Sequence, residues 1–500
     1  MGIVRKKVIK VFFMKKDITG ISKVLNENLS YIQDAFHQNK ELIIRSFFFS
    51  SDTSGCLLYL DTIADKKTVQ EHILGPILKL KELSRNPIQQ MENTIEISKI
   101  KIVSDLNEAV NELSNGNTLI FISGADSCLA ADTADWKDRA LSPPQSQRVL
   151  KGPQIGFTEL ANNNISLIKR FIKNDQLTIE DQTIGEETNT GVYLLYLADK
   201  ADRDLLKNVK SKLKSIRLKS ILDSSYIQES ISDDQITPFP RVLTTERPDV
   251  VAGHLLEGKM VIICDGSPDA LIVPALFIQF FHSPEDYYET SMFDFTRLVR
   301  IISFVASIFL IPFYIAFVLF HQELIPSELL VSLAAQRQIV PLPLVIEVIL
   351  LMVIFEVLLE SSIRLPTGIM LAFSIIGTII LGQSAAEAGI VQLSTLVVIS
   401  ATYVLNFAIP VHPFGNAIKG IRYILVFLAS TFGLYGIILG TIVLINHLTS
   451  LNSFGVPYLS PITPVKKADL KDTFIRFSLK KIINAPKKYD KDDLLKNSRK

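Results

Sequence analysis

Residues 347–366, EVILLMVIFEVLLESSIRLP, place three glutamates in an otherwise apolar run: Glu347, Glu356 and Glu360. A carboxylate among lipid chains costs free energy unless it faces protein or water. The run lies within residues 301–450, which hold only ten of the 52 basic and 51 acidic residues of the chain. Apolar runs of about 20 residues in such a charge-poor region are typical of membrane helices. The sequence therefore predicts an all-α, multi-span membrane domain over residues 296–450.

This region contains five apolar segments: 298–320, 342–359, 368–383, 389–410 and 421–447. From Lys466 onward the chain has 12 Lys or Arg against 5 Asp, and Arg297 and Arg300 lie at the start of the first segment. Because basic residues favour the cytosolic side of a membrane, both ends of the region are expected there. The number of crossings is then even, so one of the five segments does not cross.

The segment with the glutamates is the weakest candidate for a span. At about 100° per residue along a helix, Glu356 and Glu360 share one face, whereas Glu347 points the opposite way. Two prolines, Pro341 and Pro343, also lie at the start of the segment. We therefore predict about four true spans and a re-entrant or interfacial helix at residues 342–360 that is sheltered by protein.

The amino-terminal part of the chain contains an internal repeat. The strand-like sequence LLYL begins at Leu57 and again at Leu194, and in both copies Ala-Asp and a helical pattern follow seven residues after its first leucine. LSNGNTLIFISGAD, from Leu113, and LLEGKMVIICDGSPD, from Leu255, each place a second glycine eight residues after the first. Two matches in the same order predict two related α/β subdomains that arose by duplication.

These patterns divide the chain into six parts. The Pro- and Gly-rich sequence between the two α/β subdomains breaks regular structure and is interpreted as a linker. The start of the chain matches neither a secretory signal nor a myristoylation motif, so the soluble part is expected in the cytosol. The parts are a basic amino-terminal segment (1–29), α/β subdomain 1 (30–145), the linker (146–160), α/β subdomain 2 (161–295), the transmembrane domain (296–450) and a basic cytosolic tail (451–500).

Several functional classes have no support in the sequence. A net charge of +1 gives no reason to expect nucleic-acid binding. The glycine turns match neither GxxxxGKS/T nor GxGxxG, and the sequence has no GxSxG motif and no cluster with metal-ligand spacing. The three cysteines, Cys56, Cys128 and Cys264, are interpreted as buried thiols in a reducing compartment. We therefore expect no enzyme activity, cofactor or metal.

The apolar segment after the glutamates has one face of small and hydroxyl side chains. Ser374, Thr378 and Gly382 recur at four-residue spacing, and Gln383 and Glu387 lie near one end of this face. The face fits either a close helix–helix contact or the wall of a water-lined pore. The last segment has three glycines without polar companions, which favours helix packing: Gly433, Gly436 and Gly440.

Four motifs are similar to those of one known family. They are TPFPRVLTTERPDVVAGHLLEGKMVIICDGSPDALIVP (237–274), QFFHSPEDYYE (279–289), EVLLESSIRLPTGI (356–369) and GTIILGQSAAEAGIV (377–391). Together they resemble the A subunits of bacterial spore germinant receptors, the GerA family, and the likeness runs from about Glu27 to the lysine-rich tail. The chain departs from the family pattern at His282, where glutamine is expected, and in LESSIRLP, where the family has REAGIRLP.

The resemblance implies a function and a set of partners. It implies a multi-pass protein of the bacterial spore inner membrane, with both terminal regions in the cytosol of the spore core. The implied partners are a transporter-like B subunit, a lipoprotein C subunit and membrane lipid. A subunits of the family are expected to form a homo-oligomer, with a pentamer as the expected stoichiometry. This oligomer would be a nutrient-gated channel that releases monovalent cations and triggers germination.

In such a ring, one acidic residue per chain would concentrate cations. Glu360 has an alternative role as the partner of Arg364, four residues later, and Glu356 as a residue satisfied by another helix. Together with the small-residue face, the candidate ion path comprises Glu356, Glu360, Ser374, Thr378, Gly382, Gln383 and Glu387.

Two charged motifs lie shortly before the membrane region. TTERPD (244–249) and SPEDYYE (283–289) each place a proline at the start of an expected helix. Each fits either a structural cap or a contact that relays movement from the soluble part to the membrane part. The candidate coupling residues are Arg241, Glu246, Arg247, Asp249, Pro284, Glu285, Asp286 and Tyr287.

Two other functions are compatible with these patterns. The main alternative is a non-conducting scaffold, whose soluble domain binds a ligand or partner while another subunit moves the ions. An independent secondary transporter is less favoured, because the spans contain no recognisable inverted repeat.

Overall fold

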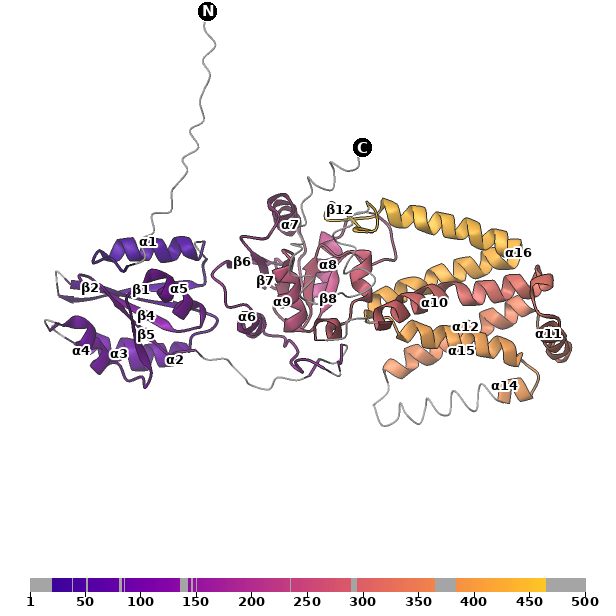
Figure 1. Ribbon diagram of the computed structural model, residues 1–500, viewed down its shortest axis with the longest axis horizontal. Helices are drawn as coiled ribbons and strands as arrows, with labels where there is room; N and C mark the ends of the chain where they lie inside the picture. Colours follow the sequence, from indigo (N-terminus) through magenta and orange to yellow (C-terminus); the bar gives the residue numbers. More distant parts are fainter. Residues whose placement is uncertain are drawn as a thin grey trace, which may run out of the picture.

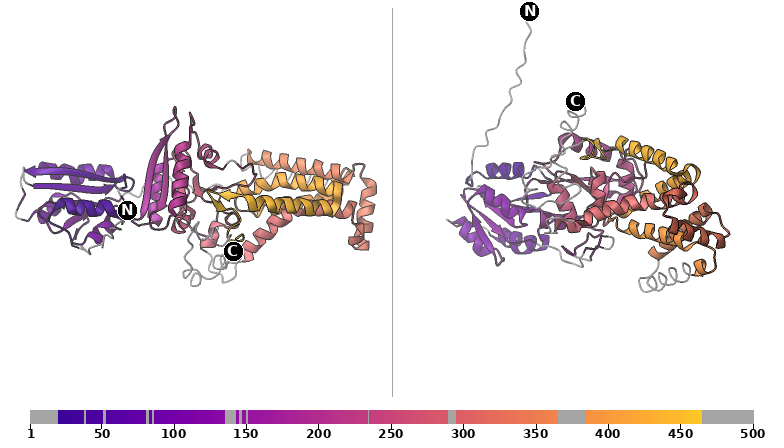
Figure 2. Two further views of the ribbon diagram at one scale, coloured as in Figure 1. Left: turned by 90° about the horizontal axis from the view of Figure 1, so that it is seen from above. Right: turned by 45° about the vertical axis from the view of Figure 1, so that its right-hand side comes forward.

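The computed structural model describes residues 20–464 with internal gaps, and its three bodies lie in a row (Figure 1). The gaps are residues 38, 51–52, 81–82, 85, 135–142, 145–146, 150, 234, 289–294 and 365–383. Subdomain 1 lies at one end, subdomain 2 in the middle and the helical region at the other end, as Figure 2 also shows from above. Subdomain 2 is therefore the body that meets the helices.

Subdomain 1 is a five-stranded antiparallel sheet with helices on both faces. Its elements are α1 (Leu25–Ala35), β1 (Leu42–Ser50), β2 (Thr53–Leu60), α2 (Lys66–Thr68), η1 (Val69–Leu74), α3 (Gly75–Lys79), α4 (Pro87–Thr94), β3 (Ile100–Val103), α5 (Leu106–Ser114), β4 (Thr118–Ile122) and β5 (Cys128–Ala131). The strand order is β1-β2-β4-β5-β3. Apolar residues of α1 and α5 cover one face, and those of η1, α3 and α4 cover the other.

Subdomain 2 repeats this architecture. Its elements are α6 (Ala161–Phe171), β6 (Leu177–Ile184), β7 (Thr190–Leu197), α7 (Arg203–Ser215), α8 (Ser224–Ile231), β8 (Leu243–Thr245), α9 (Pro248–Leu256), β9 (Met260–Cys264) and β10 (Ala270–Val273). The strand order is β6-β7-β9-β10-β8, which equals that of subdomain 1 strand by strand. Helices α6 and α9 cover one face of the sheet, and α7 and α8 cover the other.

The sequence repeat corresponds to equivalent places in the two sheets. The two LLYL copies lie in β2 and β7, and the glycine-flanked segments form β4 and β9. Gly116 and Gly258 have φ of 93° and 88°, in the left-handed region that glycine adopts at little cost. A Cβ atom at Gly258 would lie 2.8 Å from the carbonyl oxygen of Lys200. Two related α/β subdomains are therefore present, as the repeat predicts.

The helical region follows subdomain 2. Subdomain 2 ends with the short helices η2 (Phe277–Phe281) and η3 (Pro284–Tyr287). The elements of the helical region are α10 (Phe295–Leu319), η4 (Gln322–Leu324), α11 (Ser327–Ile339), α12 (Leu344–Ile363), α14 (Ser384–Glu387), α15 (Leu393–Phe407) and α16 (His412–Ser450), and the strands β11 (Asn452–Ser453) and β12 (Val456–Pro457) follow them. Among the described residues, α10 and α16 are long and apolar enough to cross a membrane, and α11 with α12 forms a third candidate bent by 80°. The predicted segment 368–383 lies wholly outside the described residues.

The last predicted span is not one straight helix. Within α16, Gly433 has the non-helical dihedral angles φ 60° and ψ −140°. A Cβ atom at Gly440 would lie 2.5 Å from the Leu425 side chain, a contact that a straight helix could not make across 15 residues. The prediction of a single span at 421–447 is therefore wrong, because α16 folds back on itself at Gly433 (Figure 1). Gly436 and Gly440 permit the close packing of its two arms, so these glycines serve helix packing as predicted.

The predicted cytosolic tail also begins differently. Residues 451–464 carry the short hairpin β11–β12, and Leu451, Ser453, Phe454 and Tyr458 are buried. The side chains of Leu451 and Tyr458 belong to one apolar cluster of subdomain 2 and that of Phe454 to the other, so this part of the tail packs on subdomain 2 instead of extending into solvent. The rest of the tail lies outside the described residues.

Candidate functional site

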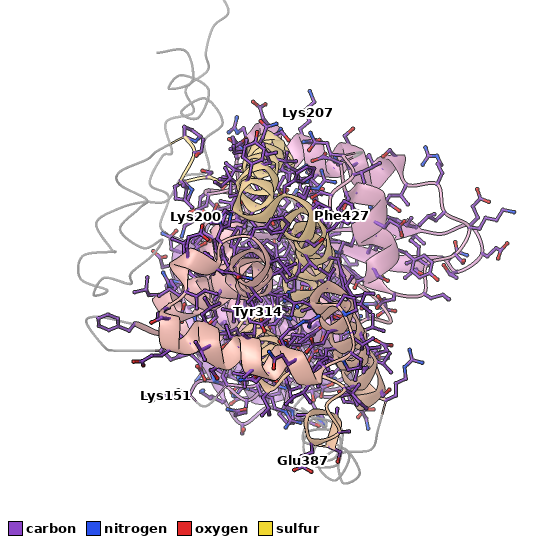
Figure 3. All side chains as sticks on the ribbon, turned by 90° about the vertical axis from the view of Figure 1, so that its right-hand side faces the viewer. Lys151, Lys200, Lys207, Tyr314, Glu387 and Phe427 are labelled. Atoms are coloured by element: carbon purple, nitrogen blue, oxygen red, sulfur yellow. The ribbon has the colours of Figure 1, made fainter. Side chains whose placement is uncertain are left out.

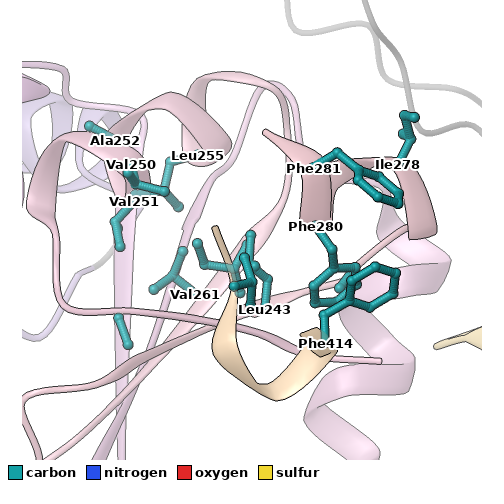
Figure 4. Close-up of a cluster of buried hydrophobic side chains, with 14 of the residues drawn as sticks. Leu243, Val250, Val251, Ala252, Leu255, Val261, Ile278, Phe280, Phe281 and Phe414 are labelled. Atoms are coloured by element: carbon teal, nitrogen blue, oxygen red, sulfur yellow. The ribbon is translucent and has the colours of Figure 1, made fainter. Parts of the chain in front are cut away.

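Subdomain 2 and the helices share one apolar core. The ring of Phe414, in α16, stacks on Phe280 of η2 at 4.9 Å between centroids and on Phe304 of α10 at 5.2 Å. Figure 4 shows the Phe280, Phe281 and Phe414 rings gathered beside the residues of α9 and β9. The same core continues into α6 and α9. Burial of these rings fixes the first and last helices to subdomain 2.

A buried ion pair lies in the TTERPD motif. Arg247 donates two hydrogen bonds to the Asp249 carboxylate, at 3.1 and 2.7 Å, and both side chains are almost fully buried. The Arg247 guanidinium also donates to the carbonyl oxygens of Gln147 and Pro153 in the predicted linker. The Tyr288 hydroxyl donates to Asp249 at 2.7 Å. This pair therefore joins the linker, the start of α9 and the segment before α10.

Tyr288 is held by its hydrogen bond to Asp249 and by packing against the linker. Burial raises the pKa of the Tyr288 phenol, and the hydrogen bond to the Asp249 carboxylate raises it further. A Cβ atom at Gly152 would lie 2.7 Å from the Tyr288 ring, and Gly152 has φ of 111°. Glycine is therefore the residue that lets the linker lie against this ring.

The SPEDYYE motif holds the start of α10. Asp286 accepts hydrogen bonds from Arg297 at 3.0 Å and from Arg300 at 3.0 Å, and the side chains of Asp286 and Arg297 are buried. Arg300 also donates to the carbonyl oxygen of Phe281 at 3.1 Å. Two arginines that share one carboxylate orient the first turns of α10 against η3.

The other predicted coupling residues lie around these contacts. Arg241 is buried and pairs with Asp233 at 3.7 Å. The carbonyl oxygen of Glu246 accepts a hydrogen bond from the amide of Phe157 at 2.7 Å. Pro284 and Glu285 lie with Asp286 in η3, as does the backbone of Tyr287, whose side chain is outside the described part.

Glu356 has partners on two other helices. Lys419 of α16 approaches its carboxylate at 2.8 Å, and the Tyr403 hydroxyl of α15 donates to it at 3.1 Å. Close by, Arg422 is buried, donates to the carbonyl oxygen of Ser307 at 2.8 Å, and lies over the Tyr403 ring at 5.2 Å. This polar cluster links α12, α15, α16 and α10. The structure thus shows Glu356 in a contact between helices, which is the alternative that the sequence left open.

The two other glutamates of this stretch differ from Glu356. Glu347 is fully buried, pairs with Arg337 of α11 at 3.1 Å and accepts the amide hydrogen of Gln392 at the start of α15. Glu360 pairs with Arg364 at 2.6 Å, and both side chains are mostly exposed. Glu347 therefore holds the bend between α11 and α12, whereas Glu360 lies on the outside of α12.

The predicted small-residue face belongs to the segment after α12. Ser374, Thr378, Gly382 and Gln383 lie outside the described residues. Glu387 is exposed at the end of α14, and Figure 3 shows its side chain at the margin of the helical region. Glu387 thus lies on a different element from Glu356 and Glu360.

Comparison with known proteins identifies the family. The family model described as Bacillus/Clostridium GerA spore germination protein matches residues 30–488. The chain belongs to the GerA family.

Two relatives and one solved structure are similar to this GerA-family chain. It is 38% identical to spore germination protein KA of Bacillus subtilis (strain 168), over 96% of this chain and 89% of that protein. It is 35% identical to the uncharacterized membrane protein YfkQ of the same organism, over 91% of this chain and 89% of that protein. The crystal structure of the N-terminal domain of the A subunit of the Bacillus megaterium spore germinant receptor GerK3 aligns at 30% identity with a TM-score of 0.42, covering 52% of this chain and 98% of that one.

The sequence analysis did not identify several residues that make these contacts in the GerA-family chain. Lys419 and Arg422 are the only Lys or Arg between residues 365 and 465, so their need for a carboxylate partner was a usable signal. Arg297 and Arg300 were used only to predict that the first apolar segment begins on the cytosolic side of the membrane. That pattern does not indicate Asp286 as their partner. Tyr288, which joins the two charged motifs, gave no distinctive signal beyond its place in SPEDYYE.

Proposed function

We propose that this chain is the A subunit of a spore germinant receptor and that its oligomer, a pentamer in our working hypothesis, forms a nutrient-gated cation channel in the spore inner membrane. Cation release through it would trigger germination. The proposal extends the family membership, and one observation carries it. Subdomain 2 and the helices share a core and are joined by the Asp286 ion pairs, and these contacts support the proposal that a movement of the soluble part would reach α10 and α16.

The ion path is proposed along α12 and the segment that follows it. Its residues are Glu356, Glu360, Ser374, Thr378, Gly382, Gln383 and Glu387. In a ring of subunits, rings of carboxylates favour cations over anions. The proposed coupling residues are those of the two charged motifs and Arg241.

The proposed setting follows from the same family role. The chain is multi-pass, its terminal regions are cytosolic, and its partners are the B and C subunits and membrane lipid. It has no enzymatic activity in this role. In support, Asp286 of η3 pairs with two arginines at the start of α10, and Thr237 of subdomain 2 contacts His447 at the end of α16, which fits an even number of crossings. Tags accessible from the cytosolic side at both termini are expected, and a carboxyl terminus exposed on the other side would contradict this topology.

A non-conducting scaffold is the second candidate function. It is favoured by the contacts of Glu356, whose carboxylate is occupied by Lys419 and Tyr403 instead of being exposed to a path. In this case the soluble part would bind a ligand or partner while another subunit conducts.

Reconstitution of the purified chain in liposomes separates the two functions. For a channel, we expect cation flux from the wild-type chain, and a several-fold change in flux and cation preference for Glu356→Gln, because one charge per subunit is removed from the ring. The exposed Glu328 of α11 gives a matched control, and Glu328→Gln should leave both unchanged. Absence of flux from a chain that still assembles would favour the scaffold.

A further inference from the structure

The chain that leaves α16 returns to subdomain 2. We call residues 451–464 the strap. Figure 1 shows β12 between α7 and the end of α16, on the side where α10 also begins. In the last turn of α16, the His447 ring lies 2.9 Å from the Thr237 hydroxyl. Subdomain 2 is therefore attached to the carboxyl end of the helical region as well as to its beginning.

Hydrogen bonds of the strap reach the backbone of subdomain 2. The Ser453 hydroxyl is fully buried, donates to the carbonyl oxygen of Arg241 at 2.8 Å and accepts the amide hydrogen of Ala275 at 3.1 Å. The Tyr458 hydroxyl donates to the carbonyl oxygen of Pro240 at 2.8 Å. Each bond satisfies a backbone group just before β8 or just after β10, so the strap occupies a specific position beside these two strands.

Phe454 holds the tip of the strap in an unfavourable backbone conformation. Its φ is 53°, a region that non-glycine residues adopt rarely and only where the surroundings impose it. The ring is buried in the core of subdomain 2 that α7 and α8 cover, and the Lys212 ammonium lies 4.8 Å from its centroid. The Phe454 carbonyl oxygen accepts a hydrogen bond from the Asn208 side chain at 3.1 Å. Contacts with α7 therefore maintain a conformation that the local sequence disfavours.

The Asp286 ion pairs and the strap attach the first and the last helix of the helical region to subdomain 2. The ion pairs hold the start of α10, and the strap holds the end of α16. A rotation of subdomain 2 would move both helices together. The helices α12 and α15 have no comparable attachment among the described residues, since their polar contacts are with other helices.

We propose that the strap is a coupling element that transmits movement of subdomain 2 to α16. This inference rests on the proposed function, because it assumes that nutrient binding is relayed through the soluble part. It predicts that nutrient-triggered cation release requires the direct connection of α16 to the strap at Ser450 and Leu451. Binding of the strap to subdomain 2 would not be sufficient without this connection.

A flexible Gly-Ser insert between Ser450 and Leu451 tests the strap in spores that carry the complete receptor. The insert leaves both the strap and α16 able to form but allows each to move independently. Potassium release after addition of nutrient broth should fall by about tenfold, within the usual range of coupling between two sites, at an unchanged amount of receptor in the membrane. The same insert between Thr463 and Pro464, beyond the hydrogen bonds of the strap, is the matched control and should have no effect.

Normal release with the insert at Ser450 would overturn the proposal. If this insert lowers the amount of receptor, Tyr458→Phe decides instead, because it keeps the ring and removes only the bond to Pro240. Reduced release at a normal amount of receptor would then support the strap, and unchanged release would overturn it. The spore experiment does not require this chain to be the conducting subunit, so absence of flux from the purified wild-type chain in liposomes would count against the proposed channel alone.

Discussion

Subdomain 2 has two boundaries, one with subdomain 1 and one with the helices, and the contacts at the two boundaries differ in polarity. Toward subdomain 1, the contacts are polar: a buried ion pair between Glu41 and Lys169, a surface pair between Lys40 and Asp181 at 2.9 Å, and a hydrogen bond of His37 to Gln176. Among the described residues, none of the large apolar clusters contains side chains of both subdomains. Toward the helices, one apolar cluster crosses the boundary.

This difference indicates which bodies move together. Apolar burial is lost as soon as two surfaces separate, whereas polar groups that separate regain hydrogen bonds to water. Subdomain 2 and the helices should therefore behave as one mechanical unit. Subdomain 1 can undock at a smaller free-energy cost, even though the two α/β subdomains share a fold.

The largest expected effect is at the boundary with the helices. Arg247→Met leaves the Asp249 carboxylate buried without its ion-pair partner, which should lower the free energy of unfolding by about 3–5 kcal/mol. The measurement is thermal unfolding of the full chain in detergent. Lys40→Met, which removes an exposed pair, is the control and should cost less than about 1 kcal/mol. Equal effects of the two substitutions would remove the proposed difference between the boundaries.

A smaller effect is expected between the α/β subdomains. Burial lowers the pKa of the Lys169 ammonium, while Glu41 opposes this shift. Lys169→Met leaves Glu41 without its cation, at a cost of about 1–3 kcal/mol, which the chain can relieve by separating the subdomains. Proteolysis of the chain between the subdomains should accelerate while the unfolding of subdomain 2 and the helices is unchanged. A global loss of stability would show that the two boundaries are coupled.

The smallest expected effect depends on pH. Burial, together with the charges of Glu246 and Asp223, raises the pKa of Asp269 from 3.8 to about 6. Since the folded-state pKa is the higher one, this group favours the folded state most below pH 3.8, and the contribution is lost as the pH rises through 6.

Asp269→Asn should therefore stabilise the chain at pH 8 and have little effect near pH 4. The gain should be less than about 1 kcal/mol, because solvent screens a partly exposed group. Thermal unfolding across this pH range measures it. Asp126, an exposed residue in the equivalent turn of subdomain 1, is the control. A gain that is the same at both pH values would contradict the assigned cause.

The two α/β subdomains were predictable because their signals are local. The apolar strand sequence LLYL, the Ala-Asp step before a helix and the paired glycines each act within about ten residues, and the second copy supports the interpretation of the first. The pairing of Glu360 with Arg364 was accessible for the same reason, since one helical turn separates the two residues. The sequence also located the charged motifs that hold α10.

The contacts of the helical region were not predictable in this way. Glu356 meets Lys419 across 63 positions of the chain, and no local pattern gives their distance in space. Gly433 was recognised as a packing residue, but the reversal of α16 depends on how two apolar arms bury each other.

By itself, the sequence determined that two related α/β subdomains are followed by a charge-poor helical region. These features follow from residue patterns within single elements and from the repetition of those patterns along the chain. Only the tertiary structure decided which surfaces are joined. It placed Ser453 against Arg241, Tyr288 against Asp249 and Phe414 between Phe280 and Phe304. Such contacts depend on the packing of distant segments, where burial and hydrogen-bond satisfaction select one arrangement among many that the local patterns allow.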